Sequence, residues 1–385
     1  MKDPELFRVR LTQMAQAFPE LFPKAMGGGF WLHSKVVSRK MKLTMRRIEM
    51  KESGAVYQIR PSFVMPYGIG RTEAVEKALF LCQFGVPFEA LAYVFGRDAG
   101  YWYRAYLSLG RPSLVGTTVK DPARLPRDLA ADEKHSWNLG ERIYLGTTVG
   151  GGVFLGIGVA ENAGTAALTK VYQEFKTEAQ ELEPEYVPQT VNTDGWEPTQ
   201  QAWHKLFPTV TLMLCFLHAV LSLQNRCRSL KPLCATLTDK VWKIYQAATK
   251  DHFSQRIRRL REWAAKTELP TPVREKLLDL CRKAPVFKQH FAFPTACRTS
   301  NSVDRLMKYL DRVLFVRQYF NGTSASARLS VRAMALIWNF HPYGSRLRHA
   351  QPQRVSPFHD LNGFQYHANW LQNLLIAASM DGHRP

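Results

Sequence analysis

The spacing of apolar residues changes along the chain, and these changes predict the order of secondary-structure elements. Between residues 125 and 222, two runs rich in β-branched and small apolar residues are joined by Gly150 and Gly151, a pair typical of a hairpin turn. A helical period, a strand, a short helix and a last strand follow. The expected strands are a short run leading into Asp132, then 142–149, 152–159, 186–193 and 210–214, and the expected helices are 163–182 and 198–207.

An alternating pattern also runs through residues 31–66, where apolar positions interleave with Lys42, Arg46 and Arg47. A turn-forming stretch and a second alternating run at 56–59 follow. The pattern predicts a basic β-hairpin. Two interpretations stay open: the hairpin lies on DNA phosphates, or it belongs to an antiparallel sheet with one face in water.

Residues 72–110 have the pattern of three short helices, separated by turns at Gly85 and Gly96. The last of them is polar and aromatic, which is typical of a helix-turn-helix DNA-binding unit. We expect Arg97 and Arg104 to contact DNA, although compact three-helix units also serve as scaffolds. The expected helices are 72–84, 88–95 and 99–109, and a linker rich in Pro, Gly, Thr and Arg is expected over 111–127.

The remainder of the chain is expected to be mainly helical. A basic stretch contains Arg258, Arg259 and Arg261, which either track DNA phosphates or form a solvated helix face. A long helix over 300–320 and an amphipathic helix over 366–378 follow. The predicted organisation is a basic β-containing region (1–70), a helix-turn-helix domain (71–115), the first part of an α/β core (125–222), a helical insertion (223–297), and the completion of the core with C-terminal helices (298–385). The element order of the core is that of a ribonuclease H-like mixed sheet.

The composition of the chain indicates the class of partner that it binds. The chain has 385 residues, of which 45% are hydrophobic, and a formal net charge of +20. Such a charge favours polyanions, above all nucleic acid, over a membrane surface or no ligand at all. The six Cys form no CxxC pair, and neither a signal peptide nor a long apolar run is present. We therefore expect a cytoplasmic protein without membrane spans.

Three short acidic motifs suggest a chemistry. Asp132 and Asp194 lie at or near the ends of expected strands, and Asp304 opens an expected helix. Carboxylates delivered in this way can converge at one edge of a sheet. Two Mg²⁺ ions held there, or Mn²⁺ in their place, can clamp the attacking and leaving oxygens of a phosphodiester. We therefore expect Asp132, Asp194 and Asp304 to be both metal ligands and catalytic residues.

Each of these acids also has a simpler explanation. Asp132 would be an exposed acid at a strand end, and Asp194 with Gly195 is a common turn pair. Asp304 would cap a helix together with Asn301, or pair with a lysine one turn on. Their order and topology, taken together, favour the shared metal site.

Two stretches resemble a known family. Asp194-Gly195-Trp196 is followed by Cys215-x-x-His218, and Asp304 follows a Thr-Ser-Asn run that ends at Asn301. This pattern resembles the DDE/D transposases, and within them the group of Mutator-like elements and related bacterial insertion sequences. These carry a Cys/Asp-x-x-His motif after the second acid and a Thr-Asn pair before the third. The likeness covers about residues 125–345.

The resemblance implies a DNA transposase of an insertion sequence. It would hydrolyse phosphodiesters at the element ends and transfer the freed strands to target DNA. The N-terminal modules would bind terminal inverted repeats, and the protein would act as a homodimer on paired ends in a prokaryotic cytoplasm. His218 would position DNA or the third acid, and Trp196 would stack on a frayed base. The plainer alternatives are structural. Cys215 would be buried, His218 would have its hydrogen bonds satisfied within the protein, and Trp196 would belong to the core.

One departure from the family concerns the third acid. The family usually has Glu at this position, whereas this chain has Asp304, which has a shorter reach and leaves reduced activity open. Asp311, two turns further along, is the substitute candidate. Two rival functions also remain: a non-catalytic DNA-binding protein derived from a transposase, and a nuclease or resolvase built on the same core.

Overall fold

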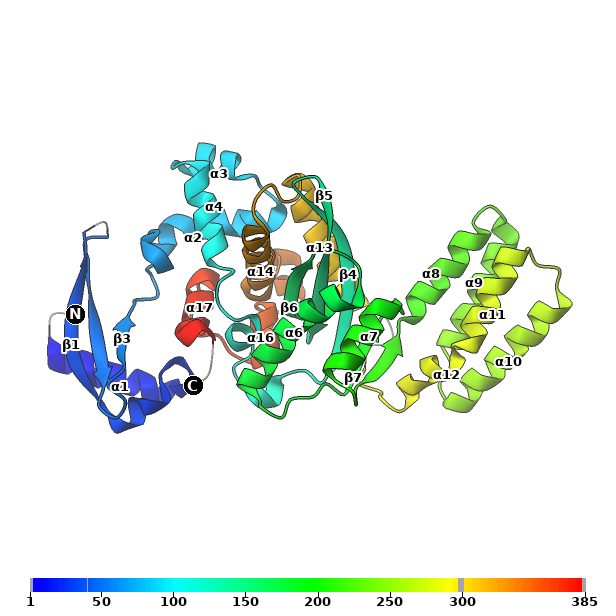
Figure 1. Cartoon of the computed structure of the whole chain (residues 1–385), viewed down its shortest axis with the longest axis horizontal. Coiled ribbons are helices and arrows are strands. Elements are labelled where there is room, and N and C mark those ends of the chain that lie inside the picture. The colour runs from blue at the N-terminus through cyan, green and yellow to red at the C-terminus, as the bar shows by residue number, and fades with distance from the viewer. Residues whose placement is uncertain (1–2, 40, 297–300, 383–385) are drawn as a thin grey trace.

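The computed structural model describes residues 3–39, 41–296 and 301–382. A five-stranded sheet with its covering helices forms the middle of the molecule (Figure 1). A small N-terminal sheet lies at one end, and a helical lobe lies at the other. In the part of the chain that is described, no helix is both long and apolar enough to cross a membrane.

The N-terminal part consists of one helix packed on a three-stranded antiparallel meander. Its elements are α1 (Pro4–Ala17), β1 (Phe30–Ser38), β2 (Leu43–Met50) and β3 (Val56–Ile59). The two expected strands are present as β2 and β3, and β1 adds a third that pairs along β2. Leu11 of α1 contacts Phe30, Ile48 and Met50 in a small core. This one-sided core gives the sheet a buried face and an exposed face, as antiparallel sheets commonly have.

The three helices expected between residues 72 and 110 are confirmed. They are α2 (Thr72–Leu81), continued by the turn η4 (Cys82–Phe84), α3 (Phe88–Phe95) and α4 (Ala99–Ser108). Trp102 and Tyr106 of α4 are each 1% exposed, and the Tyr106 hydroxyl donates to the Ser330 carbonyl in α14 (Ser324–Phe340). The polar and aromatic helix therefore packs its aromatic face into the protein interior.

The prediction of a linker over 111–127 is wrong. This segment forms α5 (Leu114–Thr118) and the turn η5 (Pro122–Arg124), and Leu114 is fully buried. Lys120 is also buried, and its Nζ donates to the carbonyls of Gly116 at 2.6 Å and Ala377 at 2.5 Å. The segment is rich in the small residues that are typical of a linker. Here these small residues allow neighbouring helices to pack closely around it.

A five-stranded mixed sheet forms the core. Its strands are β4 (Asp128–Asn138), β5 (Glu141–Gly150), β6 (Val153–Ala160), β7 (Thr190–Thr193) and β8 (Thr211–Leu214). The spatial order is β6-β5-β4-β7-β8, with β4, β5 and β6 antiparallel and β4, β7 and β8 parallel. The predicted element order is confirmed, and the mixed sheet is compatible with a ribonuclease H-like fold.

Helices cover both faces of this sheet (Figure 1). One face packs on α6 (Thr165–Leu182) and α7 (Glu197–Leu206), and the other packs on α13 (Asn301–Val316), α14 and α17 (Trp370–Ala377). Because successive strand residues point to opposite faces, β4 contributes to both cores. Ala131 belongs to the cluster around α6 and α7, whereas Ala130 belongs to the cluster around α13 and α14.

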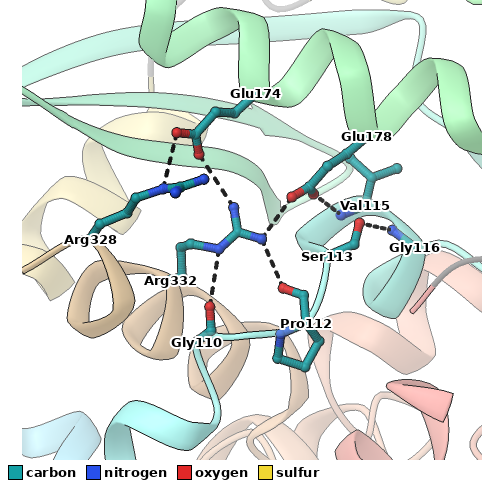
Figure 2. Close-up of polar contacts among 9 residues, drawn as sticks. All are labelled: Gly110, Pro112, Ser113, Val115, Gly116, Glu174, Glu178, Arg328 and Arg332. Atoms are coloured by element: carbon teal, nitrogen blue, oxygen red, sulfur yellow. Dashed lines mark hydrogen bonds and ion pairs between the residues drawn. The ribbon is translucent and has the colours of Figure 1, made fainter. Parts of the chain in front are cut away.

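A buried arginine ties the segment after α4 to the core helices (Figure 2). The guanidinium of Arg332 on α14 donates to the carbonyls of Gly110 at 3.1 Å and Pro112 at 2.8 Å. It also pairs with Glu178 of α6 at 2.7 Å and with Glu174 at 3.5 Å. Gly110 approaches α14 so closely that a Cβ there would lie 2.0 Å from the Leu329 carbonyl oxygen. These contacts fix the position of the segment that follows α4 and leads to the sheet.

The segment after β8 forms a helical lobe with its own hydrophobic cluster, which begins at Phe216 and not at 223. Its helices are α8 (Phe216–Cys227), α9 (Lys231–Tyr245), α10 (Lys250–Lys266), α11 (Thr271–Arg282) and α12 (Ala284–Phe287). The remaining elements are α15 (Ser345–Ala350), α16 (Pro357–Asn362) and the turns η1 (Pro19–Leu21), η2 (Lys24–Gly28), η3 (Pro66–Gly68), η6 (Lys288–Phe291) and η7 (Ser379–Gly382).

Candidate active site

The strand register brings Asp132, Asp194 and Cys215 to one row of the sheet. In the parallel β4–β7 pair, Asp128 lies opposite Thr190 and Ala130 lies opposite Asn192. Asp132 and Asp194 each lie two residues beyond the last of these pairs, and Asp194 directly follows β7. In the same way, the β7–β8 register continues to Asp194 and Cys215. Because adjacent strands lie about 4.8 Å apart, these side chains share one edge.

The expected strand-end position is confirmed for Asp194 but is wrong for Asp132. Asp194 directly follows β7, whereas β4 runs on from Asp132 to Asn138. The longer β4 is held by its antiparallel partner β5, which accompanies it to its end. Asp132 nevertheless reaches the edge of the parallel part of the sheet, because β7 stops beside it.

The pKa of Asp132 indicates that the third acid, Asp304, lies on the same side of the sheet as Asp132. Alternation along β4 puts Asp132 on the face covered by α13, and Asp304 lies half-buried in the first turn of α13. Burial, together with the charges of Asp194 and Asp304, raises the pKa of Asp132 to about 6. The backbone N–H of Glu133 and the charge of His218 oppose this rise. Asp132 therefore lies within electrostatic reach of both Asp194 and Asp304.

Asp194 is exposed and held by its own turn. Its Oδ1 accepts the backbone N–H of Trp196 at 2.8 Å, and Gly195 takes a φ of +93°. The turn pair considered as a simple alternative is thus present, and it also fixes the direction of the carboxylate. The Trp196 ring lies half-buried, 6.2 Å from the Tyr144 ring at the edge of the core. This packing favours a structural role for Trp196.

Cys215 and His218 form a hydrogen-bonded pair beside these acids. Cys215 is 1% exposed and precedes α8, and its backbone N–H donates to the Thr193 carbonyl at 2.8 Å. The hydrogen bond with Cys215 raises the pKa of His218 to about 9, and the charges of Asp132 and Asp194 act in the same direction. Burial opposes this rise and the charge of Cys215 adds to it, so His218 is protonated as one member of a pair with Cys215.

The sequence reasoning missed Glu133. It points to the opposite face from Asp132, where it accepts a hydrogen bond from the Thr199 hydroxyl at 2.5 Å and another from the Tyr172 hydroxyl. Burial raises the pKa of Glu133 to about 7, against the lowering effect of both hydrogen bonds. The signal available in the sequence was the strand alternation, which places neighbouring acids on opposite faces.

Asp311 is paired elsewhere and does not replace Asp304. Its carboxylate forms an ion pair with the ammonium group of Lys134, two residues beyond Asp132 on β4. Asp304 is thus the acid of α13 that influences Asp132. Asn301 opens α13, but its side chain and the preceding Thr299 and Ser300 lie outside the described residues.

The chemistry of the site fits a hard divalent cation, although the spacing of the donors is loose. Three carboxylates offer the oxygen ligands that Mg²⁺ prefers. Among the described residues, no group of three Asp, Glu, His or Cys side chains stands at metal-ligand spacing. A shared ion would therefore draw the carboxylates closer together than they stand here, and it would relieve the repulsion that raises the pKa of Asp132.

The predicted DNA-contact residues lie on surfaces away from these acids. Lys42 and Arg47 are exposed on the N-terminal sheet, while the Arg46 guanidinium lies 5.3 Å from the Phe7 ring. Arg97 is exposed in the turn before α4, and Arg104 is exposed on α4 itself. Arg258, Arg259 and Arg261 are exposed on α10 of the helical lobe (Figure 1).

Comparison with family models and with curated proteins identifies no relative of this chain. It matches no protein-family model, and no curated protein matches it significantly. Arguments about function therefore rest on the geometry of the site and on the sequence motifs.

Proposed function

We propose that this protein is a DDE/D-type DNA transposase with a ribonuclease H-like core and a helical insertion. One observation supports the proposal: Asp132 lies within electrostatic reach of acids from two distant segments, Asp194 and Asp304. Structural acids are usually spread over a surface or paired with cations. Convergence of like charges at a sheet edge is instead typical of a functional site.

Asp132, Asp194 and Asp304 would hold Mg²⁺ or Mn²⁺. The bound ions would neutralise the phosphate charge and lower the pKa of an attacking water. The chain itself supplies the alignment. The Trp196 N–H fixes the Asp194 carboxylate, and the charged His218 lies next to Asp132 and Asp194 without being a ligand. The substrate would be double-stranded DNA, cleaved at the element ends and joined to target DNA.

The test combines cleavage with binding. Purified protein is incubated with Mg²⁺ or Mn²⁺ and DNA from the borders of its gene, where inverted repeats bounded by short direct duplications are expected. The wild type should cut at the repeat ends and join them to a target plasmid. Asp194→Asn should abolish cleavage while DNA binding persists.

The matched control is Asp128→Asn on the same strand as Asp132. Its carboxylate accepts the Thr190 hydroxyl at 2.7 Å, a bond that the amide oxygen can keep. It should leave cleavage unchanged. Binding without cleavage in either metal would overturn the enzymatic proposal. Cleavage of generic DNA without joining would instead indicate a nuclease on the same core.

A further inference from the structure

A small pocket connects the carboxylate site to the helical lobe. It has a volume of ≈ 230 Å³ and lies between α8 and α11. Asp194, Cys215 and His218 line one side, and Lys276 and Lys283 of α11 line another. The insertion therefore contributes side chains to a cavity that contains one of the proposed metal ligands.

The cationic side of this pocket is organised around one carboxylate. Asp279 of α11 pairs with Lys283 at 3.2 Å, with Arg282 at 3.3 Å and with Lys276 at 3.8 Å. Its side chain is 27% exposed, less than any of its three partners. One carboxylate thus pairs with three cations, of which Lys276 and Lys283 line the pocket together with Asp279 itself.

Stability does not account for this cluster. Ion pairs between exposed side chains contribute little to folding, because water screens them and ordering long side chains costs entropy. A shared carboxylate does, however, restrict where Lys276 and Lys283 can point. Oriented ammonium groups are suited to bind a phosphate.

We propose that Lys276 and Lys283 bind a DNA backbone phosphate next to the one that is cleaved. A strand whose scissile phosphate sits at Asp194 has its neighbouring phosphates within a few ångströms, and the pocket begins at Asp194 itself. The helical insertion is then a strand-positioning part of the active site. This inference rests on the proposed function for the identity of the reaction, but the phosphate contact can be tested separately.

The experiment measures binding of a fluorescent DNA duplex of random sequence in EDTA, as a function of salt. The test variant is Lys276→Gln/Lys283→Gln. The control is Lys231→Gln/Lys243→Gln, which removes two exposed lysines from α9 of the same lobe, neither of which lines this pocket. We expect the test variant to bind about fivefold to tenfold more weakly than the control and to lower the salt slope by about 1.

A second arm separates this inference from the proposed function. In the cleavage assay with metal, the test variant should raise KM with kcat nearly unchanged, as expected for a residue that positions the strand. If both double variants bind equally well, the phosphate contact is refuted, whatever the cleavage result. If wild-type protein never cleaves but the test variant alone weakens binding, the transposase proposal fails and the phosphate contact stands.

Discussion

Asp132 and Glu133 are adjacent residues with opposite surroundings. Asp132 faces α13, where Asp194 and Asp304 add negative charge, while Glu133 faces the hydroxyls of Tyr172 and Thr199. Burial is the main cause of the raised pKa in both, and the charge of Asp194 raises both as well. The two residues differ in their other neighbours: Asp304 raises the pKa of Asp132, whereas hydrogen bonds from Thr199 and Tyr172 lower that of Glu133.

The first prediction concerns the convergence of the acids in the absence of metal. Asp194→Asn removes a negative neighbour, so the pKa of Asp132 should fall from about 6. A fall on the order of half a unit or more is expected for a charge within a few ångströms. An NMR pH titration of carbon-labelled Asp measures it. Asp128→Asn, four residues earlier on β4, should leave the value unchanged; an equal pKa in wild type and Asp194→Asn would show that the acids do not meet.

The raised pKa of Glu133 predicts that the free energy of unfolding depends on pH. Its pKa is raised from 4.5 to about 7 in the folded protein. The stability that it contributes is therefore fully present below the unfolded pKa and is lost as the pH rises toward 7. The loss is on the order of 3 kcal/mol. Glu133→Gln keeps an oxygen that accepts both hydroxyls and has no charge to bury, so it should be the more stable protein above pH 7.

Denaturant unfolding across this pH range measures the effect. The control is Glu161→Gln at an exposed position before α6, which should follow the wild-type curve. Parallel curves for Glu133→Gln and wild type would refute the assignment of a buried, protonated Glu133.

At the scale of elements, the Arg332 network joins three parts of the fold (Figure 2). The Arg332 side chain is 7% exposed and connects α14 with α6 and with the segment after α4. Arg332→Ala leaves Glu178 and two carbonyls without this donor. We expect a loss of about 3–5 kcal/mol in the free energy of unfolding.

Arg328 is the matched control for this substitution. It lies one turn earlier on α14, pairs with Glu174 at 3.1 Å and is 54% exposed. Because water already solvates this pair, Arg328→Ala should cost less than about 1 kcal/mol. Chemical denaturation compares the two variants, and equal losses would mean that burial of Arg332 does not matter.

At the scale of the whole molecule, positive charge is spread over both ends of the structure, on either side of the carboxylate edge. The N-terminal sheet and the helical lobe lie at opposite ends of the molecule (Figure 1), and the formal charge is +20. Arg258→Gln/Arg259→Gln on α10 should therefore weaken DNA binding and reduce its salt slope by about 2, if each arginine meets a phosphate.

Fluorescence anisotropy at several salt concentrations provides this measurement. Lys170→Gln/Lys205→Gln removes the same charge from the exposed surface of α6 and α7, on the other face of the sheet from α13. This control should change binding less. A common slope for both double variants would mean that the lobe attracts DNA only through net charge.

The sequence by itself determined which segments become strands and helices between residues 125 and 222, because period and turn residues are local properties. It also singled out the acids, since Asp194 follows a strand and Asp304 opens a helix in the structure as expected. The helices of the insertion and of residues 72–110 follow from the same local rules.

Only the tertiary structure decided how these elements meet. The length of β4 depends on pairing with β5, and the position of Asp132 beside Asp194 depends on where β7 stops. The segment 111–127 has the composition of a linker but is buried, because α6, α14 and α17 surround it. Register and burial are set by partners remote in the chain, so no local pattern of residues encodes them.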